Sequence, residues 1–234
     1  MNKKLSDLIN IIVIFVIIGT LVCAKPMAKV QADAVNDEYY FLRSWGGEGL
    51  MNPRGFDFGL DGTIYIASLD NKIIALNPSL EVFNTWGDYG SEPGNFNEPL
   101  DVAVDRMGYV YVSDCLNDRI QKFTSDGDFI LEWGSHGSGI GQFFCPDGIA
   151  IDANNQIYVA DIQNSRIQKF SSTGQYITQW GNQGQGEGEF YHPESVAVDT
   201  DGLVYVADTC NSRIEVFSPD VNFIKQWPTN DVDN

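Results

Sequence analysis

The sequence predicts an all-β fold made of tandem repeats, and three observations support this prediction. Tryptophans close successive strand-like runs at spacings of 41, 47, 47 and 47 residues, at Trp45, Trp86, Trp133, Trp180 and Trp227. Other residue types recur between them with the same period of 47. No segment after residue 34 has the sustained hydrophobic period of about 3.6 residues that a long helix needs. A fixed period of this length is typical of repeat proteins.

Each unit repeats a proline, two aspartates, a tyrosine and an arginine in register. The residues are Pro99, Pro146 and Pro193; Asp105, Asp152 and Asp199; Tyr111, Tyr158 and Tyr205; Asp114, Asp161 and Asp208; and Arg119, Arg166 and Arg213. In the third unit, turn residues separate four short strands at 148–152, 156–160, 166–170 and 175–180. Four antiparallel strands in about 40–50 residues predict one blade of a β-propeller.

The motifs of the third unit carry a family resemblance. They are PDGIAID at 146–152, IYVAD at 157–161, NSRIQKF at 164–170 and the Trp180-Gly181 pair, and the same pattern stands at 99–133 and 193–227. This pattern resembles the NHL-repeat family over roughly residues 39 to 227. The resemblance implies a β-propeller, commonly of six blades. Because one fold hosts many functions, it implies no single activity.

We expect the propeller to occupy residues 39–229, with four-stranded blades at about 46–86, 87–133, 134–180 and 181–227. The first blade has Lys72 in place of the repeated arginine and Ser68 in place of the aspartate, which is typical of a terminal, capping repeat. Residues 39–45 match a fourth strand, so the pattern predicts 17 strands. Three arrangements remain open: a small closed ring with a spare strand, an incomplete (open) ring, and a ring completed by another chain.

The first 34 residues have a different composition. Lys3 and Lys4 precede an apolar run at 11–24, which has about the length of the hydrophobic region of a signal peptide. We expect residues 1–34 to be a signal peptide or a membrane anchor, which would form a hydrophobic helix. A linker at 35–38 follows, and a tail occupies 230–234. Either interpretation places the propeller outside the cell or at the cell surface, and links it to a membrane only through this segment.

The net charge constrains the partners. The chain has a net charge of −18, and from Val35 onward 10 basic and 30 acidic residues give 10 − 30 = −20. A surface this negative repels phosphate backbones and anionic lipids, so nucleic-acid binding is disfavoured. Cations and basic partners fit it better.

Three cysteines follow the N-terminal segment, namely Cys115, Cys145 and Cys210. An odd number leaves at least one thiol outside an intramolecular pair. Cys115 and Cys145 should lie on the same face of adjacent blades. We therefore weigh a disulfide between them against buried or free thiols.

An aspartate and an arginine recur five residues apart in blades 2 to 4. One interpretation is structural, in which each arginine pairs with the carboxylate or with loop carbonyls. The other is a ring of side chains on the face of the long glycine-rich loops that follow each tryptophan, where binding is expected. The candidate binding residues are Asn117, Arg119, His136, Asn164, Arg166, Asn211 and Arg213.

Cofactor signals are weak. The glycine-rich loops carry glutamate and precede no helix, unlike phosphate-binding loops. Asp199-Thr-Asp201-Gly202 resembles part of a calcium loop but also fits a hairpin turn, so weak Ca²⁺ binding is the most that it suggests. His136 and His192 are too few for a three-histidine zinc site. We therefore expect no cofactor and no catalytic metal.

The function predicted first is an exported scaffold that binds a protein, peptide or glycan through the loops on one face, without enzymatic activity. One alternative is a metal-dependent lyase or lactonase of the propeller type. The other is an assembly unit that another chain completes, and this alternative includes self-association.

Overall fold

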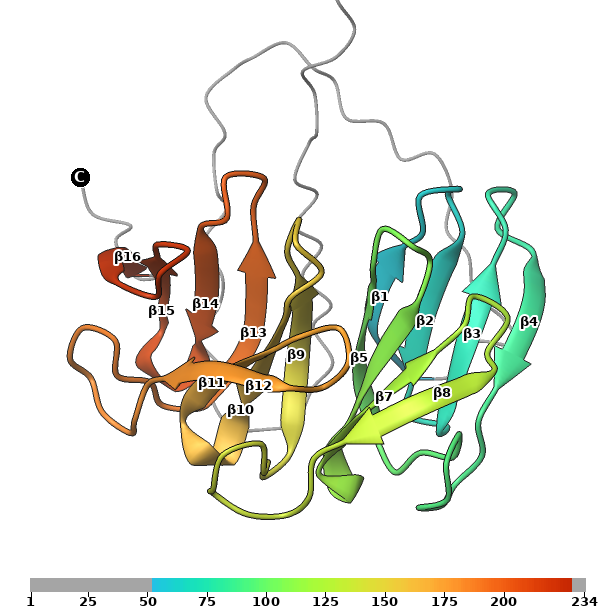
Figure 1. The fold of residues 1–234 in the computed structure, drawn as a ribbon, viewed down its shortest axis with the longest axis horizontal. Helices are drawn as coiled ribbons and strands as arrows, with labels where there is room; N and C mark the ends of the chain where they lie inside the picture. The colour runs from blue at the N-terminus through green and yellow to red at the C-terminus, as the bar shows by residue number, and fades with distance from the viewer. Residues whose placement is uncertain (1–51, 229–234) are drawn as a thin grey trace, which may run out of the picture. The chain divides into compact units, whose positions relative to one another are not determined.

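The structure, a computed structural model, describes residues 52–228, which form sixteen strands in four antiparallel sheets. Figure 1 shows the sheets following one another along the chain. The signal peptide or anchor, the strand predicted at 39–45 and the tail lie outside the described residues. Within residues 52–228 the structure contains no helix with the length and hydropathy of a membrane span.

Each blade consists of four consecutive strands. Blade 1 contains β1 (Pro53–Phe58), β2 (Ile64–Ser68), β3 (Lys72–Leu76) and β4 (Val82–Trp86). Blade 2 contains β5 (Pro99–Val104), β6 (Val110–Asp114), β7 (Arg119–Phe123) and β8 (Phe129–Trp133). Blade 3 contains β9 (Pro146–Ile151), β10 (Ile157–Asp161), β11 (Arg166–Phe170) and β12 (Tyr176–Trp180). Blade 4 contains β13 (Pro193–Val198), β14 (Val204–Asp208), β15 (Arg213–Phe217) and β16 (Phe223–Pro228).

The repeated aspartate and tyrosine shape the turn between the first two strands of a blade. In blade 3, Oδ1 of Asp152 accepts hydrogen bonds from the backbone N–H groups of Asn154 and Gln156 at 2.8 and 2.9 Å. The Tyr158 hydroxyl donates to Oδ2 of the same aspartate at 3.2 Å. The carboxylate thus satisfies turn donors that the sheet leaves unpaired, which explains why this pair recurs in blades 2 to 4.

Short 3₁₀ turns lie between the second and third strands of blades 2, 3 and 4, and the sequence analysis did not predict them. They are η1 (Cys115–Asn117), η2 (Ile162–Asn164) and η3 (Thr209–Asn211). Each ends at a residue in the left-handed region, with φ of 53° at Asp118, 53° at Ser165 and 54° at Ser212. These turns direct the side chains at the start of the third strand towards the loop that leads into the same blade.

The hydrophobic core lies between neighbouring blades. Between blades 2 and 3, for example, Tyr111 and Ile120 pack with Ile149, Ile157 and Phe170. The tryptophans that end blades 1 to 3 pack on the third strand of the next blade, as Trp133 does on Phe170 with ring centroids 5.8 Å apart. These aromatic rings therefore form part of the core at each joint.

The first strands of the blades pack in chain order, β1 against β5, β5 against β9, and β9 against β13. The described residues show no comparable packing between β13 and β1. Within the described part of the chain, the four blades therefore have three joints and two end faces, as in an incomplete ring.

Candidate functional site

Three loops lead from the tryptophan of one blade to the first proline of the next, at residues 87–98, 134–145 and 181–192, and we call them the leading loops. Each folds back on itself in the same way. In the second one, the backbone N–H of Phe143 donates to the carbonyl of Ser135 at 2.9 Å, and that of Gly137 donates to the Phe143 carbonyl at 2.9 Å. The phenylalanines of the three loops, Phe96, Phe143 and Phe190, are fully buried. Each loop is thereby anchored in the core between blades.

A buried arginine holds each leading loop in place. In blade 3, Nε of Arg166 donates to Oδ2 of Asp161 at 2.8 Å. Its two terminal nitrogens donate to the carbonyls of Ser138, Gly139 and Gln142 at 2.8, 2.9 and 2.8 Å. Arg119 binds Ser91, Glu92 and Asn95 in the same way, and Arg213 binds Gln185, Gly186 and Glu189.

The repeated asparagine also binds the leading loop. In each of blades 2 to 4, we call the aspartate, asparagine and arginine together the clamp. Nδ2 of Asn164 donates to the Gly137 carbonyl at 2.9 Å and to Asp161. Asn117 and Asn211 donate to the equivalent carbonyls of Gly90 and Gly184 at 2.9 and 2.8 Å. Because the arginine donors are buried and bonded to loop carbonyls, these side chains preorganise the loops, as in the structural interpretation of the Asp–Arg spacing. The side chains that a partner could contact are those that the loops carry on their outer side.

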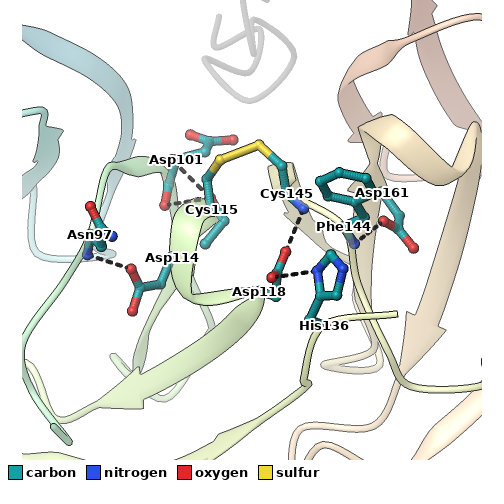
Figure 2. The surroundings of a disulfide bond; sticks show 10 residues. Asn97, Asp101, Asp114, Cys115, Asp118, His136, Phe144, Cys145 and Asp161 are labelled. Carbon is teal, nitrogen blue, oxygen red and sulfur yellow. Dashed lines mark hydrogen bonds and ion pairs between the residues drawn. A yellow bond between two sulfur atoms is a disulfide. The ribbon is translucent and has the colours of Figure 1, made fainter. Parts of the chain in front are cut away.

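Blades 2 and 3 are linked by a disulfide between Cys115 and Cys145 (Figure 2). Asp118 lies beside it, and its Oδ1 accepts the backbone N–H of Cys145 at 2.8 Å. Its Oδ2 lies 2.9 Å from Nδ1 of His136, whose exposed ring stands edge-on to Phe144 at 4.9 Å. His136, alone among the candidate binding residues, thus lies on the exposed side of a leading loop. Cys210, which lies in the turn η3 of blade 4, is exposed.

The leading loops and the turn η1 also carry exposed apolar side chains. They are Tyr89 at 74% exposure, Ile140 at 68%, Leu116 at 52%, Phe144 at 46% and Tyr191 at 41%. We call these residues, together with His136, the leading-loop surface. A hollow of about 210 Å³ beside Tyr191 is lined by Gln183, Gly184 and Gln185.

Apart from His136, the residues of this surface were not among the predicted binding residues, because they do not recur from repeat to repeat. The displayed positions differ between repeats. Tyr89 is replaced by His136 and Gln183, Asn97 by Phe144 and Tyr191, and Leu116 by Gln163 and Cys210. A repeated clamp that presents different side chains is a suitable arrangement for recognition. The signal in the sequence was the variation within an otherwise regular loop.

Two of the three leading loops, at 87–98 and 181–192, carry negative charge. Their acidic residues are Asp88, Glu92, Glu98, Glu187 and Glu189, and their sequences contain no lysine or arginine. Lys72, from β3, contacts Asp88 at 3.0 Å. The surface therefore combines aromatic side chains with carboxylates, and it favours a partner that carries positive charge.

A second set of carboxyl groups lies on the first strands of the blades. Burial raises the pKa of Asp101 to about 8 and that of Asp147 to about 7. Asp101 accepts hydrogen bonds from the backbone N–H groups of Val102 and, across the joint, of Ile149. Asp101 thus links blades 2 and 3.

The described residues show no group of three histidine, cysteine, aspartate or glutamate side chains placed to hold a metal. The Asp199 carboxylate is engaged by the backbone N–H groups of Asp201 and Leu203 and by the Tyr205 hydroxyl, all at 2.9 Å. This segment is a hairpin turn of the kind seen in blades 2 and 3. His192 precedes Pro193 with φ of 55°, and its ring lies against Tyr191.

Comparison with known proteins identifies the repeat. The family model described as NHL repeat matches residues 96–123, 143–170 and 190–217. The chain contains three NHL repeats. Each matched segment runs from the buried phenylalanine of a leading loop to the phenylalanine that ends the third strand of the same blade. Each match thus contains the aspartate, asparagine and arginine that hold the loop, together with the buried phenylalanine that anchors it.

Two curated relatives have related repeats. NHL repeat-containing protein 3 of Homo sapiens is 35% identical over 86 residues, which cover 32% of this chain and 25% of that protein. Protein wech of Drosophila melanogaster is 33% identical over 83 residues, covering 36% of this chain and 10% of that protein. The matched segments span a quarter or less of these two relatives.

Solved structures show the same fold at low sequence identity. A streptogramin B lyase aligns with a TM-score of 0.59 at 18% identity, over 76% of this chain and 54% of the lyase chain. The WD40 repeats of RRP9 align with a TM-score of 0.62 at 13% identity, over 76% of this chain and 52% of that chain. These likenesses establish the propeller-like fold and leave the activity to the site itself.

Proposed function

We propose that this NHL-repeat protein is an exported scaffold that binds a protein or peptide partner through the leading-loop surface. The observation that carries the proposal is the contrast between a buried, repeated clamp and the exposed side chains that it presents. Rigid loops that display aromatic anchors lose little conformational freedom on binding, which favours affinity. Export is supported by the composition of residues 1–34 alone.

The chemistry of the surface indicates the kind of partner. Tyr89, Phe144 and Tyr191 offer large apolar areas, and the two tyrosines add polar hydroxyls of the kind common in residues that dominate binding energy. The loop carboxylates add attraction for lysine and arginine. We therefore expect partner segments that combine apolar side chains with positive charge.

Selection from a random-peptide phage library on the immobilised full-length chain tests this proposal. We expect enriched peptides to bind the wild-type chain and to bind at least about tenfold more weakly to the triple variant Tyr89→Ala, Phe144→Ala, Tyr191→Ala. The matched control is Phe83→Ala, Phe129→Ala, Ile177→Ala, which removes exposed apolar side chains from the outer strands. Equal binding by both variants, or no enrichment, would contradict the proposal. Binding to a glycan array without peptide enrichment would assign the surface to glycans instead.

Metal analysis of the purified chain distinguishes the scaffold from the lyase or lactonase alternative. The solved lyase shares the fold with this chain at 18% identity, which carries no activity across. Stoichiometric bound metal together with substrate turnover would favour the enzyme over the scaffold.

A further inference from the structure

Each blade has one face that points towards the next blade, which we call its following face, and an opposite preceding face. In blades 1 to 3 the following face is covered. The tyrosine on the second strand is 3% exposed at Tyr65, fully buried at Tyr111 and 1% exposed at Tyr158. The isoleucines of the third strand, Ile73 and Ile120, are fully buried. The next blade covers these side chains at all three joints.

Blade 4 has the same following face, and the described structure leaves it partly open. The equivalent residues Tyr205 and Ile214 are half-buried and Ala197 is exposed, whereas Ala103 in blade 2 is 3% exposed. Trp227 is 45% exposed. This face is therefore built for a joint that the described part of one copy does not form.

The ring geometry of blade 4 differs for the same reason. Trp86, Trp133 and Trp180 each lie within 6 Å of a phenylalanine on the next blade and stand steeply against their own tyrosine. Trp227 instead stacks on Tyr205 with an interplanar angle of 11°, and the Lys225 ammonium lies 4.3 Å from its ring centre. The Trp227 indole thus packs on its own blade, which indicates that no following blade covers it within the described residues.

Blade 1 supplies the complementary half. In blade 2 the preceding face uses Val102, Val110, Val112 and Phe123 to cover blade 1. The register of the strands places Phe56, Ile64, Ile66 and Leu76 at the equivalent positions of blade 1. Ile66 and Leu76 form a buried cluster with Ile74, on which Phe56 and Ile64 pack.

This preceding face is also incompletely covered near its first strand. Phe56 and Ile64 are half-buried, whereas their counterparts Val102 and Val110 are 2% and 0% exposed. Phe58, at the end of β1, is 57% exposed. The preceding face of blade 1 and the following face of blade 4 thus carry the two halves of one kind of joint.

We propose that two copies of this chain associate so that blade 4 of each copy packs on blade 1 of the other. The contact is head-to-tail, and two such joints close a ring of 2 × 4 = 8 blades. A second copy is favoured as the occupant because each copy carries both apolar halves, in the residue types that already form three joints within the chain. Closure would cover Trp227 and Phe58, which otherwise contribute to exposed apolar patches. This joint is independent of the binding role proposed for the leading-loop surface.

The charge of the chain sets how the association depends on salt. Each copy carries a net charge of −18, so two copies repel one another. Salt screens this repulsion and strengthens apolar contacts. We expect the dimer to be tighter at high ionic strength than at low ionic strength.

Sedimentation of the purified full-length chain tests the proposal. We expect a dimer for the wild type and a monomer for Ala197→Glu, with association weakened at least about tenfold. The matched control is Thr200→Glu, which places the same charge on an exposed turn residue of the same blade and should leave the dimer intact. Trp227→Gln is a second, milder change of the same face, and near-ultraviolet circular dichroism checks that each variant is folded. A wild-type chain that stays monomeric up to about 100 µM, or a dimer that survives both changes, would overturn the proposal.

A mixing experiment identifies the occupant. Phe58→Glu alters blade 1 and should also give a monomer when alone. An equimolar mixture of Ala197→Glu and Phe58→Glu chains retains one intact joint, so we expect it to form a mixed dimer that neither variant forms by itself. A Phe58→Glu chain that dimerises alone, or a mixture that stays monomeric at ten times the wild-type dimerisation concentration, would exclude blade 1 of a second copy as the occupant.

Discussion

The guanidinium of Arg166 and the carboxylate of Asp161 form a buried ion pair with an Nε–Oδ2 distance of 2.8 Å. The same arginine binds three carbonyls of the leading loop at 134–145, so one side chain joins the blade to the loop. Replacing Arg166 with methionine leaves Asp161 buried without its cation. We expect this change to lower the free energy of unfolding by about 3–5 kcal/mol.

Urea unfolding of Arg166→Met measures this loss. The matched control is Lys72→Met in blade 1, because Lys72 makes a more exposed pair with Asp88. That pair should contribute at most about 1 kcal/mol. Similar losses in the two variants would show that burial of the ion pair does not increase its contribution to the free energy of unfolding.

The Cys115–Cys145 disulfide closes a segment with a sequence separation of 30. Closing such a segment restricts the unfolded chain, so we expect Cys115→Ser, Cys145→Ser to lower the free energy of unfolding by about 2–4 kcal/mol. A reducing agent should destabilise the wild type by a similar amount and leave the double variant unchanged, since Cys210 is present in both. Destabilisation of the double variant by the reducing agent would point to a different cysteine reaction.

Stability should fall as the pH rises, because of Asp101. Burial, with a smaller contribution from the nearby Asp147 and Asp57, raises its pKa from the ordinary value of 3.8 to about 8, although the N–H groups of Ile149 and Val102 lower it in part. The folded chain therefore holds a proton that the unfolded chain releases between about pH 4 and pH 8. The resulting stabilisation is fully present below the unfolded pKa and is lost as the pH rises through the folded one.

Urea unfolding at pH 5, 7 and 9 measures this dependence. Asp101→Asn keeps the acceptor for the Ile149 N–H and removes the titration, so its stability should change less over this range. The remaining slope should come from other groups with raised pKa values, such as Asp147. An identical slope in the wild type and in Asp101→Asn would show that Asp101 is ionised in the folded protein.

Two glycines of one leading loop separate the effect of close packing from that of backbone strain. Gly134 has φ of +110°, and a Cβ there would lie 2.8 Å from the Asp118 carbonyl oxygen and 2.7 Å from the Phe143 ring. Gly141 has φ of +71° and open space around it. We expect Gly141→Ala to cost about 1–2 kcal/mol of stability from the left-handed backbone alone. Gly134→Ala should cost about 1–3 kcal/mol more, from overpacking. Equal losses in thermal or urea unfolding would contradict the close approach.

Much of the blade could be predicted from the sequence because each strand carries its own local signals. The third repeat was predicted with strands at 148–152, 156–160, 166–170 and 175–180, and the observed strands begin and end within two residues of these. The turns with a repeated aspartate were found because the carboxylate bonds to N–H groups two and four residues later. Interactions between residues so close in the sequence can be predicted from the residue types and their spacing.

The features that were missed depend on contacts between distant residues. Ser165 adopts φ of 53°, although serine has little preference for that region, at the end of the turn that precedes the buried Arg166. The face to which Arg166 points could not be decided from its spacing to Asp161, since exposed and buried pairs have the same spacing. Whether blade 4 meets blade 1 depends on the angle between successive blades. The sequence of a single repeat does not determine that angle.

The central claim is that the leading-loop surface binds the partner. Hydrogen–deuterium exchange of the full-length chain, with and without a peptide selected on it, tests this claim most directly. We predict slower exchange in residues 88–98, 135–145 and 182–192, and no change in the outer strands β4, β8 and β12. Slower exchange confined to the outer strands, or to the turns that contain Asp105 and Asp152, would contradict the claim.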